Sequence, residues 1–472
     1  MRVSGFLAGL LIFCSAIGQA ESLKPTVDDL LVQRGQAMLA VEHPAVIRHM
    51  LRNDGFGGPS SPLIARMMLS DAPALVAEAK AKMTIEPHGK GLWLIRFPYV
   101  NVALVETRDS LVLIDAGYAA IGPVLRDMIP TLSIKPLKYI VITHDHIDHA
   151  YGAKALMSGK IKPQIITSDL FPAMAAKEVR LSGSIGRYNN QALQFQPKTI
   201  SDLPTPDIVF SKKMTRKIGG ETFVFYHFPA ETEEQIWVSL PGRGVIFTAD
   251  YYQGFLPNAG NGKRIGRHID EWIEALRTMI SLKPRLMLPM HGAAVAGEAK
   301  VAELLGLQAD ALDHINEQVI ARLNTGERKD RIAASIDWPE RFAKEPSLDP
   351  QYNRPEDIAR MVATRWTGWW DDIPSHFAAL NFDEEAAEAL RLAGGVEAVD
   401  KRTRALLPTK PRLAARLADW ALFGAPDDPV ALQLAIDVYL ARIMEKDMPV
   451  QEAGVYFAAA GRARGMLAAL KR

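Results

Sequence analysis

The sequence predicts an α/β domain followed by an all-α domain. Short apolar runs rich in β-branched residues recur between residues 93 and 290, which is the pattern of buried strands separated by loops and helices. After residue 300 the apolar residues instead recur at a spacing near that of an α-helix. The chain has 472 residues, 48% of them hydrophobic, which is enough for two domains with separate cores.

The chain begins with the layout of a secretory signal peptide. Arg2 precedes an apolar stretch at 6–13, and small residues then lead to Ala20, after which we expect cleavage. The apolar stretch is too short to span a membrane. Cys14 is the only cysteine in the sequence, so the mature protein would have neither disulfides nor a thiolate nucleophile. Export without cysteine suits the bacterial periplasm, where we expect the protein to be located.

The elements of the first domain then follow in order. Residues 21 to about 85 have helical periodicity, as in 30–39, and we expect them to pack outside the strand-rich part. Three strands are predicted next, over 93–96, 102–106 and 111–115, because each stretch is apolar and rich in branched side chains.

The most informative segment comes directly after a fourth predicted strand, residues 137–142. It carries three histidines and two aspartates within six positions: His144, Asp145, His146, Asp148 and His149. The carboxyl ends of strands in parallel sheets usually present ligands and catalytic groups. Imidazole nitrogens and carboxylate oxygens are ligands for Zn²⁺ and similar cations. Because the spacings do not fit one face of a helix, we predict a tight loop that serves two metal ions.

This H-x-H-x-D-H pattern resembles the metallo-β-lactamase superfamily. The resemblance implies an αββα metallo-β-lactamase sandwich and three further ligands that follow later strands. The residues that follow the predicted strands 223–228, 245–249 and 286–290 are Glu231, Asp250 and His291.

The resemblance also implies two divalent metal ions per chain, with Zn²⁺ expected. The seven ligands would divide into two triads and a bridging acid: His144, His146 and Glu231; Asp148, His149 and His291; and Asp250. Together the cations would bind a water, lower its pKa towards 7 and polarise the ester. Asp148 would thereby take part in catalysis. Asp145 would act as a proton shuttle or would only cap the turn, and the sequence leaves both roles open.

Glu231 departs from most of the superfamily, which has a histidine at that position. Bacterial alkyl sulfatases, which this chain resembles, also have Glu there, followed at a similar distance by a second acid. Asp250 follows Glu231 by nineteen residues; the family has Glu at that second position, so Asp250 shortens the arm by one methylene. His227, inside the preceding predicted strand, is an alternative ligand, and the sequence favours Glu231 over it.

Two segments are candidates for binding the substrate anion. The stretch 163–206 contains five prolines and resembles the insert through which alkyl sulfatases reach over their metals, and its Tyr188 and Asn189 are expected to contact substrate. Arg264 and Arg267 lie in a basic stretch that resembles the family segment supplying an arginine to sulfate. A planar guanidinium can donate to two sulfate oxygens at once. The alternative is a solvated basic turn before the next predicted helix.

The resemblance continues into the second domain. Residues 365–374 look like the aromatic segment of the all-α helical dimerisation domain of alkyl sulfatases, and residues 394–395 like the glycine pair that follows it. The stretches 411–423 and 428–443 have the periodicity of an antiparallel helix pair. The resemblance implies a homodimer built through residues from about 300 onward. The sterol-carrier-like domain that ends the longer alkyl sulfatases is expected to be absent.

We therefore expect a signal peptide over 1–20, a metallo-β-lactamase-like catalytic domain over 21–300 and a helical dimerisation domain over 301–472. The 55 Lys and Arg nearly balance the 54 Asp and Glu, which gives no support for nucleic-acid or membrane binding. The expected function is hydrolysis of small-molecule sulfate esters. Phosphodiesters, lactones or β-lactams are alternative substrates of such a scaffold, and a metal-dependent binding protein is the alternative outside enzymes.

Overall fold

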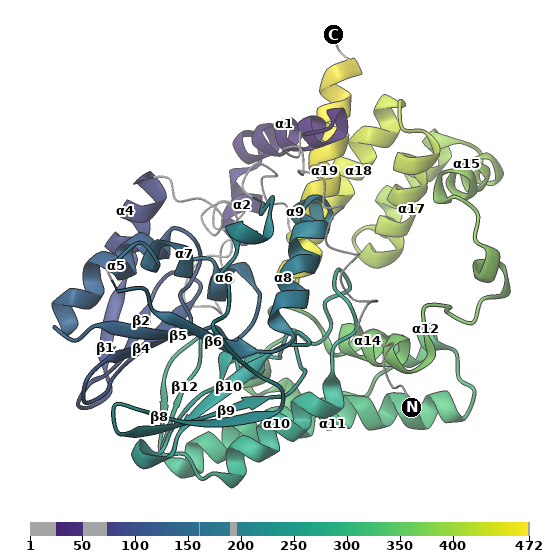
Figure 1. The fold of residues 1–472 in the computed structure, drawn as a ribbon. Coiled ribbons are helices and arrows are strands. Elements are labelled where there is room, and N and C mark those ends of the chain that lie inside the picture. Colours follow the sequence, from purple (N-terminus) through teal and green to yellow (C-terminus); the bar gives the residue numbers. More distant parts are fainter. Residues whose placement is uncertain (1–24, 51–72, 160, 189–195, 471–472) are drawn as a thin grey trace, which may run out of the picture.

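The computed structural model describes residues 25–50, 73–159, 161–188 and 196–470. They form two packed sheets with helices on both outer faces, followed by a group of helices (Figure 1). This arrangement is the αββα sandwich and the following all-helical region that the sequence predicts. The expected signal peptide lies outside the described residues. Among the helices of the described ranges, none is both long and apolar enough to cross a membrane.

The first sheet contains seven strands that neighbour one another in chain order. They are β1 (Thr84–Pro87), β2 (Leu92–Arg96), β3 (Asn101–Glu106), β4 (Leu111–Ile114), β5 (Leu137–Val141), β6 (Gln164–Ser168) and β7 (Ile208–Phe210). Strands β1 to β4 pair antiparallel, and β4 to β7 pair parallel. In β3, Ala103 and Val105 pack towards the second sheet while Val102 and Leu104 pack towards the outer helices, as the two-residue period of a strand requires.

The second sheet has the order β13-β12-β11-β10-β9-β8. Its strands are β8 (Lys213–Ile218), β9 (Glu221–His227), β10 (Ile236–Leu240), β11 (Val245–Phe247), β12 (Leu286–Leu288) and β13 (Val295–Ala296). Only β11 and β12 pair parallel among these strands. Phe223, Phe225 and Val238 of this sheet share a core with Val141 and Ile166 of the first sheet, so the two inner faces are packed together.

Helices cover both outer faces of the sandwich. The helices packed on the first sheet are α4 (Pro73–Lys82), α5 (Ile121–Leu132), α6 (Ile147–Ala150), α7 (Ala153–Leu156) and α8 (Phe171–Arg180). Those packed on the second sheet are α10 (Ile269–Ser281), α11 (Glu298–Asn324) and α14 (Pro355–Thr367), with α12 (Lys329–Ala334) and α13 (Glu340–Ala343) beside them. The long α11 therefore joins the sandwich to the helical region (Figure 1).

Seven further helices share a separate core. They are α1 (Val27–Glu42), α2 (Pro44–Met50), α15 (Phe382–Ala393), α16 (Val396–Leu406), α17 (Pro411–Gly424), α18 (Pro429–Ile443) and α19 (Val450–Leu470). The predicted helix pair is present as α17 and α18. The N-terminal helix α1, expected to belong to the catalytic domain, packs instead against α19 of the helical region (Figure 1).

Two segments differ in detail from the sequence expectation. Part of the stretch 163–206 is not an insertion, because β6 is a paired strand of the first sheet; the added elements are α8 and α9 (Ser182–Tyr188), which follow it. The aromatic stretch around residue 369 is not wholly helical. The helix α14 ends at Thr367 and is capped by Gly368, whose φ of 83° favours glycine, and Trp369 beyond it is 71% exposed.

Candidate metal centre

The histidine-rich loop starts where β5 ends, between the parallel neighbours β4 and β6. Ile140 and Val141 bury the end of the strand, and the chain then turns through Thr143 and His144. His146 precedes the single-turn helix α6, so Asp148 and His149 lie on its first turn. The loop therefore directs its imidazoles and carboxylates to the carboxyl edge of the sheet, where ligands are expected.

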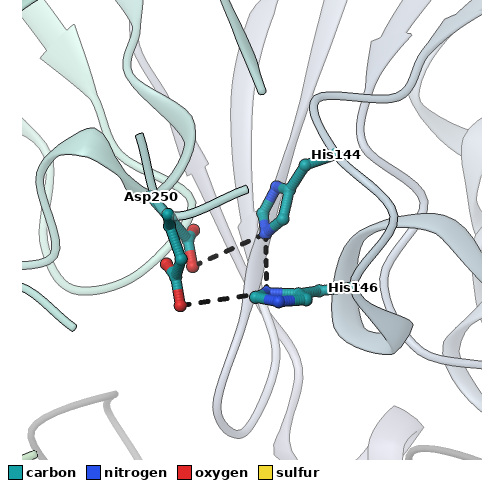
Figure 2. Close-up of side chains that lie close together, drawn as sticks. His144, His146 and Asp250 are labelled. Carbon is teal, nitrogen blue, oxygen red and sulfur yellow. Dashed lines mark hydrogen bonds and ion pairs between the residues drawn. The ribbon is translucent and has the colours of Figure 1, made fainter. Parts of the chain in front are cut away.

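One group of donor atoms belongs to His144, His146, Glu231 and Asp250, and all four lie within 4.8 Å of one another. His144 Nε2 is 2.9 Å from His146 Nδ1 and 3.9 Å from Asp250 Oδ2. His146 Nδ1 is 3.9 Å from Glu231 Oε1. Figure 2 shows the two imidazole rings and the Asp250 carboxylate turned towards one shared point.

A second group is formed by Asp148, His149 and His291, again within 4.8 Å. Asp148 Oδ2 lies 3.4 Å from His149 Nε2 and 3.5 Å from His291 Nε2. Asp250 also reaches this group, since its two oxygens lie 3.3 Å from His149 Nε2 and from His291 Nε2. Asp250 is thus placed between the groups, as a bridging ligand would be.

The donors fit two bound cations. His149 Nε2 and Asp250 Oδ1 are buried, and beyond the ion-pair contacts within these groups neither atom makes a hydrogen bond among the described residues. Buried polar atoms without partners are costly, and a cation is one of the few groups that would compensate several of them at once. The mixture of imidazole nitrogens and carboxylate oxygens suits a borderline divalent metal. A divalent-metal centre is therefore the arrangement that this site supports.

The surroundings of the first group keep the imidazoles of His144 and His146 neutral, which is the form that binds metal. Burial, followed by the nearby His149, lowers the pKa of His144 to about 3. Burial and His144 also lower the pKa of His146 well below its usual value. A neutral imidazole keeps a lone pair for a metal. Burial and the charge of Asp250 raise the pKa of Glu231 to about 8, so ionising both acids together calls for positive charge nearby.

The histidines of the second group are fixed through their other ring nitrogens. Asp115 Oδ2 lies 2.8 Å from His149 Nδ1, and the same carboxylate accepts hydrogen bonds from the backbone and side chain of Thr143 at 2.8 and 2.9 Å. His291 Nδ1 lies 2.6 Å from the carbonyl oxygen of Tyr99. These contacts leave Nε2 of both rings facing the centre, which is how outer partners orient metal-binding histidines.

Asp145 belongs to neither ligand group. Its backbone N–H donates to Glu234 Oε1 at 2.7 Å, and its Oδ2 is buried without a hydrogen-bond partner among the described residues. Burial and the adjacent Asp145 raise the pKa of Glu234 well above its usual value. Glu234 therefore anchors the loop between the two histidine ligands of the first group.

The loop after Asp250 surrounds Glu231. Asn258 Nδ2 donates to Glu231 Oε1, Gln253 Nε2 donates to Oε2 at 3.4 Å, and Arg267 donates to Oε1 at 3.5 Å. Arg267 is almost completely buried, so it is not part of a solvated basic turn. Its guanidinium partly neutralises the charge of the Glu231 carboxylate.

The other predicted substrate-binding residues have different surroundings. Arg264 Nη1 lies 3.5 Å from Glu178 Oε1. After burial and His144, the charges of Arg264 and Arg267 are the next causes that lower the pKa of His146, so both cations lie near the first group. Tyr188 ends α9, but its side chain and all of Asn189 lie outside the described residues.

His227 belongs to neither group. It ends β9, and its ring nitrogens contact two backbone carbonyl oxygens, of Ser211 and of Glu233. Neither ring nitrogen is left for a cation, which supports the preference for Glu231 over His227 as a ligand.

Sequence reasoning missed several partners of the centre. Asp115 and Glu234 are buried acids with no motif around them, although Asp115 ends a predicted strand. Tyr352 lies in the loop before α14 and hydrogen-bonds to Tyr99; burial, followed by the charge of Glu231, raises its pKa to about 12. The helical region thus adds a phenol at the edge of the centre, and an isolated tyrosine in a loop gives no signal in a sequence.

Family comparisons divide the chain in the same way. Residues 95–291 match the model of the metallo-beta-lactamase superfamily, and residues 328–465 match that of the alkyl sulfatase dimerisation region. The first match ends at His291, just after β12, and the second begins at residue 328, just before α12.

Several curated relatives have similar sequences. A linear primary-alkylsulfatase from Pseudomonas sp. is 27% identical over 70% of this chain and 67% of its own length. The alkyl/aryl-sulfatase BDS1 of Saccharomyces cerevisiae is 24% identical over 71% and 57%, and an (R)-specific secondary-alkylsulfatase from Pseudomonas sp. is 24% identical over 71% and 56%. The chain therefore spans between about half and two thirds of these relatives.

The same fold is found in a solved structure. The stereoselective inverting sec-alkylsulfatase Pisa1 from Pseudomonas sp. matches with a TM-score of 0.71 and 20% identity, over 94% of this chain and 79% of that protein. At this identity the match shows the fold alone, including the helical region after the sandwich. The chain thus joins a domain that matches the metallo-β-lactamase superfamily to a region that matches the alkyl sulfatase dimerisation family.

Proposed function

We propose that the protein is a dinuclear-metal hydrolase of organic sulfate esters. The observation that carries the proposal is the set of buried donors gathered in two groups that share Asp250 and include the acid Glu231. The relatives named as alkylsulfatases support the same substrate class.

The two groups would each hold one divalent cation, with Asp250 between them. Zn²⁺ is our candidate, because mixed histidine and carboxylate sets of this size suit it. Bound there, the cations would supply Lewis acidity towards the ester and lower the pKa of water. The chain contributes preorganisation: Asp115 and the carbonyl of Tyr99 hold the rings of His149 and His291 in place.

Arg264 and Arg267 are the proposed contacts for the sulfate group. Arg267 already touches Glu231, but its Nε is buried without a hydrogen-bond partner among the described residues, so one donor remains for an anion. Tyr188 and Asn189, at the end of α9 and just beyond it, are proposed to contact the ester from the side of the insert.

Two acids have proposed catalytic roles. Asp148 would act as a ligand of the second cation, next to the reacting ester. Asp145 lies in the ligand loop between His144 and His146, and one of its carboxylate oxygens is buried. It is therefore our candidate for moving a proton to the leaving group. The anchor from Glu234 fixes the backbone that carries this carboxyl.

We also propose the location, processing and assembly of the enzyme. We propose a periplasmic homodimer in which residues 1–20 are removed, 21–300 carry catalysis and 301–472 form the contact between subunits. The match to an alkyl sulfatase dimerisation model and the exposed aromatics near α14 support the dimer.

Metal analysis followed by a substrate panel tests the function. We expect two divalent ions per chain and release of sulfate from alkyl or aryl sulfates, with Asp148→Ala losing one ion. One ion per chain in a fully loaded preparation, unchanged by Asp148→Ala, would contradict the dinuclear centre. Cleavage of phosphodiesters, lactones or β-lactams without sulfate release would leave the fold assignment intact and contradict the proposed substrate class.

A further inference from the structure

Glu178 occupies an unusual position on α8. This helix follows β6, and its buried face carries Phe171 and Ala175, which pack in the core beneath the first sheet. Glu178 lies one turn after Ala175 on the same face and is 5% exposed. A carboxylate on an apolar face is costly unless a specific partner compensates it. The position therefore calls for an explanation beyond packing.

Arg264 is the partner of this carboxylate. Its Nη1 lies 3.5 Å from Glu178 Oε1, and both side chains are largely buried. Burial and the nearby Asp145 raise the pKa of Glu178 to about 7, against the opposing effect of Arg264. The carboxyl is therefore mostly ionised on the alkaline side of neutral pH.

Arg264 also belongs to the loop that encloses the first ligand group. The backbone N–H of Arg264 donates to the carbonyl of Asn261 at 3.1 Å, which fixes the turn. On either side of this turn, Asn258 and Arg267 donate to Glu231. Arg264 thus carries its charge between the insert and the metal ligands, where a substrate anion would be bound.

We propose that Glu178 determines anion specificity: paired with Arg264, it cancels much of that cation's charge, so the site favours a singly charged sulfate monoester over a doubly charged phosphate monoester. This inference rests on the proposed function and deepens it. The energy of an ion pair scales with the product of the charges, so an uncompensated Arg264 would attract a dianion about twice as strongly as a monoanion. Partial neutralisation by Glu178 removes most of that advantage.

The test uses the full-length, metal-loaded protein at pH 8.5, with octyl sulfate and octyl phosphate as matched substrates. Glu178→Gln keeps the shape and removes the charge. We expect the ratio of kcat/KM for sulfate to that for phosphate to fall about tenfold, mainly through a lower KM for the phosphate. Inhibition by inorganic phosphate should strengthen relative to inhibition by inorganic sulfate, while metal content stays at the wild-type value.

Three further variants separate this role from a structural one. Glu178→Asp keeps the charge and should keep the ratio near wild type. In an Arg264→Gln background, adding Glu178→Gln should leave the ratio unchanged, because the cation that it modulates is gone. Glu221→Gln removes the carboxylate of a similar pair, 3.0 Å from Arg243, and should not alter the ratio. If Glu178→Gln does not fold, Glu178→Ala replaces it with the same expected direction.

The outcomes distinguish the two proposals. In one outcome the wild-type enzyme cleaves sulfates while Glu178→Gln lowers kcat/KM for both substrates in parallel or leaves their ratio unchanged. That result would overturn the role of Glu178 and would leave the proposed function intact. A loaded wild-type protein that releases no sulfate from any alkyl or aryl sulfate overturns both.

Discussion

Glu231 shows how one residue type changes the charge of the whole metal centre. An acid in place of a histidine adds a negative charge beside Asp250, and the two carboxylates raise each other's cost of ionisation. Asn258 and Arg267 donate to Glu231, which lowers this cost without removing it. Such a centre should hold its cations firmly and should be a weaker Lewis acid than one with a neutral imidazole.

Removing this acid tests its role directly. We expect Glu231→Ala to lose one metal ion and to lower kcat by about a hundredfold or more, because a ligand and a negative charge disappear together. The matched control is His227→Ala, four residues earlier, whose ring contacts only backbone carbonyls and which should keep both ions. Metal content by atomic spectroscopy, beside steady-state rates, decides between them. Loss of metal from a folded His227→Ala protein, with Glu231→Ala unaffected, would reverse the assignment.

Glu178 should make stability depend on pH. Its pKa is raised to about 7 in the folded protein from an ordinary value near 4.5, so the folded state binds the proton more tightly than the unfolded state. Stability from this group is therefore greatest below the ordinary value and falls as pH rises through 7. Since each pKa unit corresponds to about 1.4 kcal/mol, Glu178→Gln should stabilise the protein by up to about 3 kcal/mol at pH 8.5 and hardly at pH 4.5. Urea unfolding at the two pH values measures the difference, and equal effects at both would contradict this account.

At the scale of elements, the strands and the order of the ligands along the chain could be predicted from the sequence. The reason is that the ligands follow apolar runs that form buried strands. β5, β11 and β12 end within a few residues of His144, Asp250 and His291. Parallel pairing places the ends of β11 and β12 side by side, and the packing of the two sheets brings the end of β5 to them. The sandwich that the sequence predicts is confirmed for this reason.

Contacts between loops could not be predicted in the same way. Asp115 reaches Thr143 and His149 across 28 and 34 residues, and Glu234 reaches Asp145 across 89. Each contact consists of one or two hydrogen bonds that depend on which loops meet in three dimensions. No periodicity or spacing records it, so these partners appear only in the structure.

The crossing of α1 and α19 gives a prediction about a pair of elements. A Cβ on Gly35 would lie 1.7 Å from the carbonyl oxygen of Gly461, so the two backbones are too close for any side chain. We expect Gly35→Val to separate the helices and to lower stability by about 1–3 kcal/mol. The control is Gly306→Ala in α11, where the added Cβ would meet only Ile280 at 3.9 Å and should be neutral or stabilising. Thermal unfolding of both variants checks this, and a neutral Gly35→Val would mean that the crossing is not formed in solution.

At the scale of the whole molecule, the segment after α14 exposes large apolar side chains. Trp369, Phe377 and Leu380 are each about 70% exposed, and Trp369 packs against Phe377 at a ring distance of 6.0 Å. Exposed apolar groups gathered in one segment are typical of interaction surfaces. We expect the protein to be a dimer of about 100 kDa at micromolar concentration, twice the mass of one 52.0 kDa chain.

Light scattering coupled to gel filtration tests this expectation. Trp369→Ser should shift the protein towards monomer, whereas Ile134→Ser, at a fully exposed residue before β5, should not. A wild-type monomer that retains full activity would contradict the dimer.

The ligands of the centre come from both halves of the sandwich. His144, His146, Asp148 and His149 follow a strand of the first sheet, whereas Glu231, Asp250 and His291 follow strands of the second. Bound cations would therefore act as cross-links between two layers that are otherwise joined by an apolar core and by hydrogen bonds such as that from the Asn101 N–H to the Met290 carbonyl, and metal uptake would become part of the folding equilibrium. At a free metal concentration one hundred times the dissociation constant, a single site contributes about 2.7 kcal/mol. Chelation should accordingly lower the Tm and increase hydrogen exchange in β5 and β11 together, and exchange that rises in one sheet alone would show that the layers are held independently of the metals.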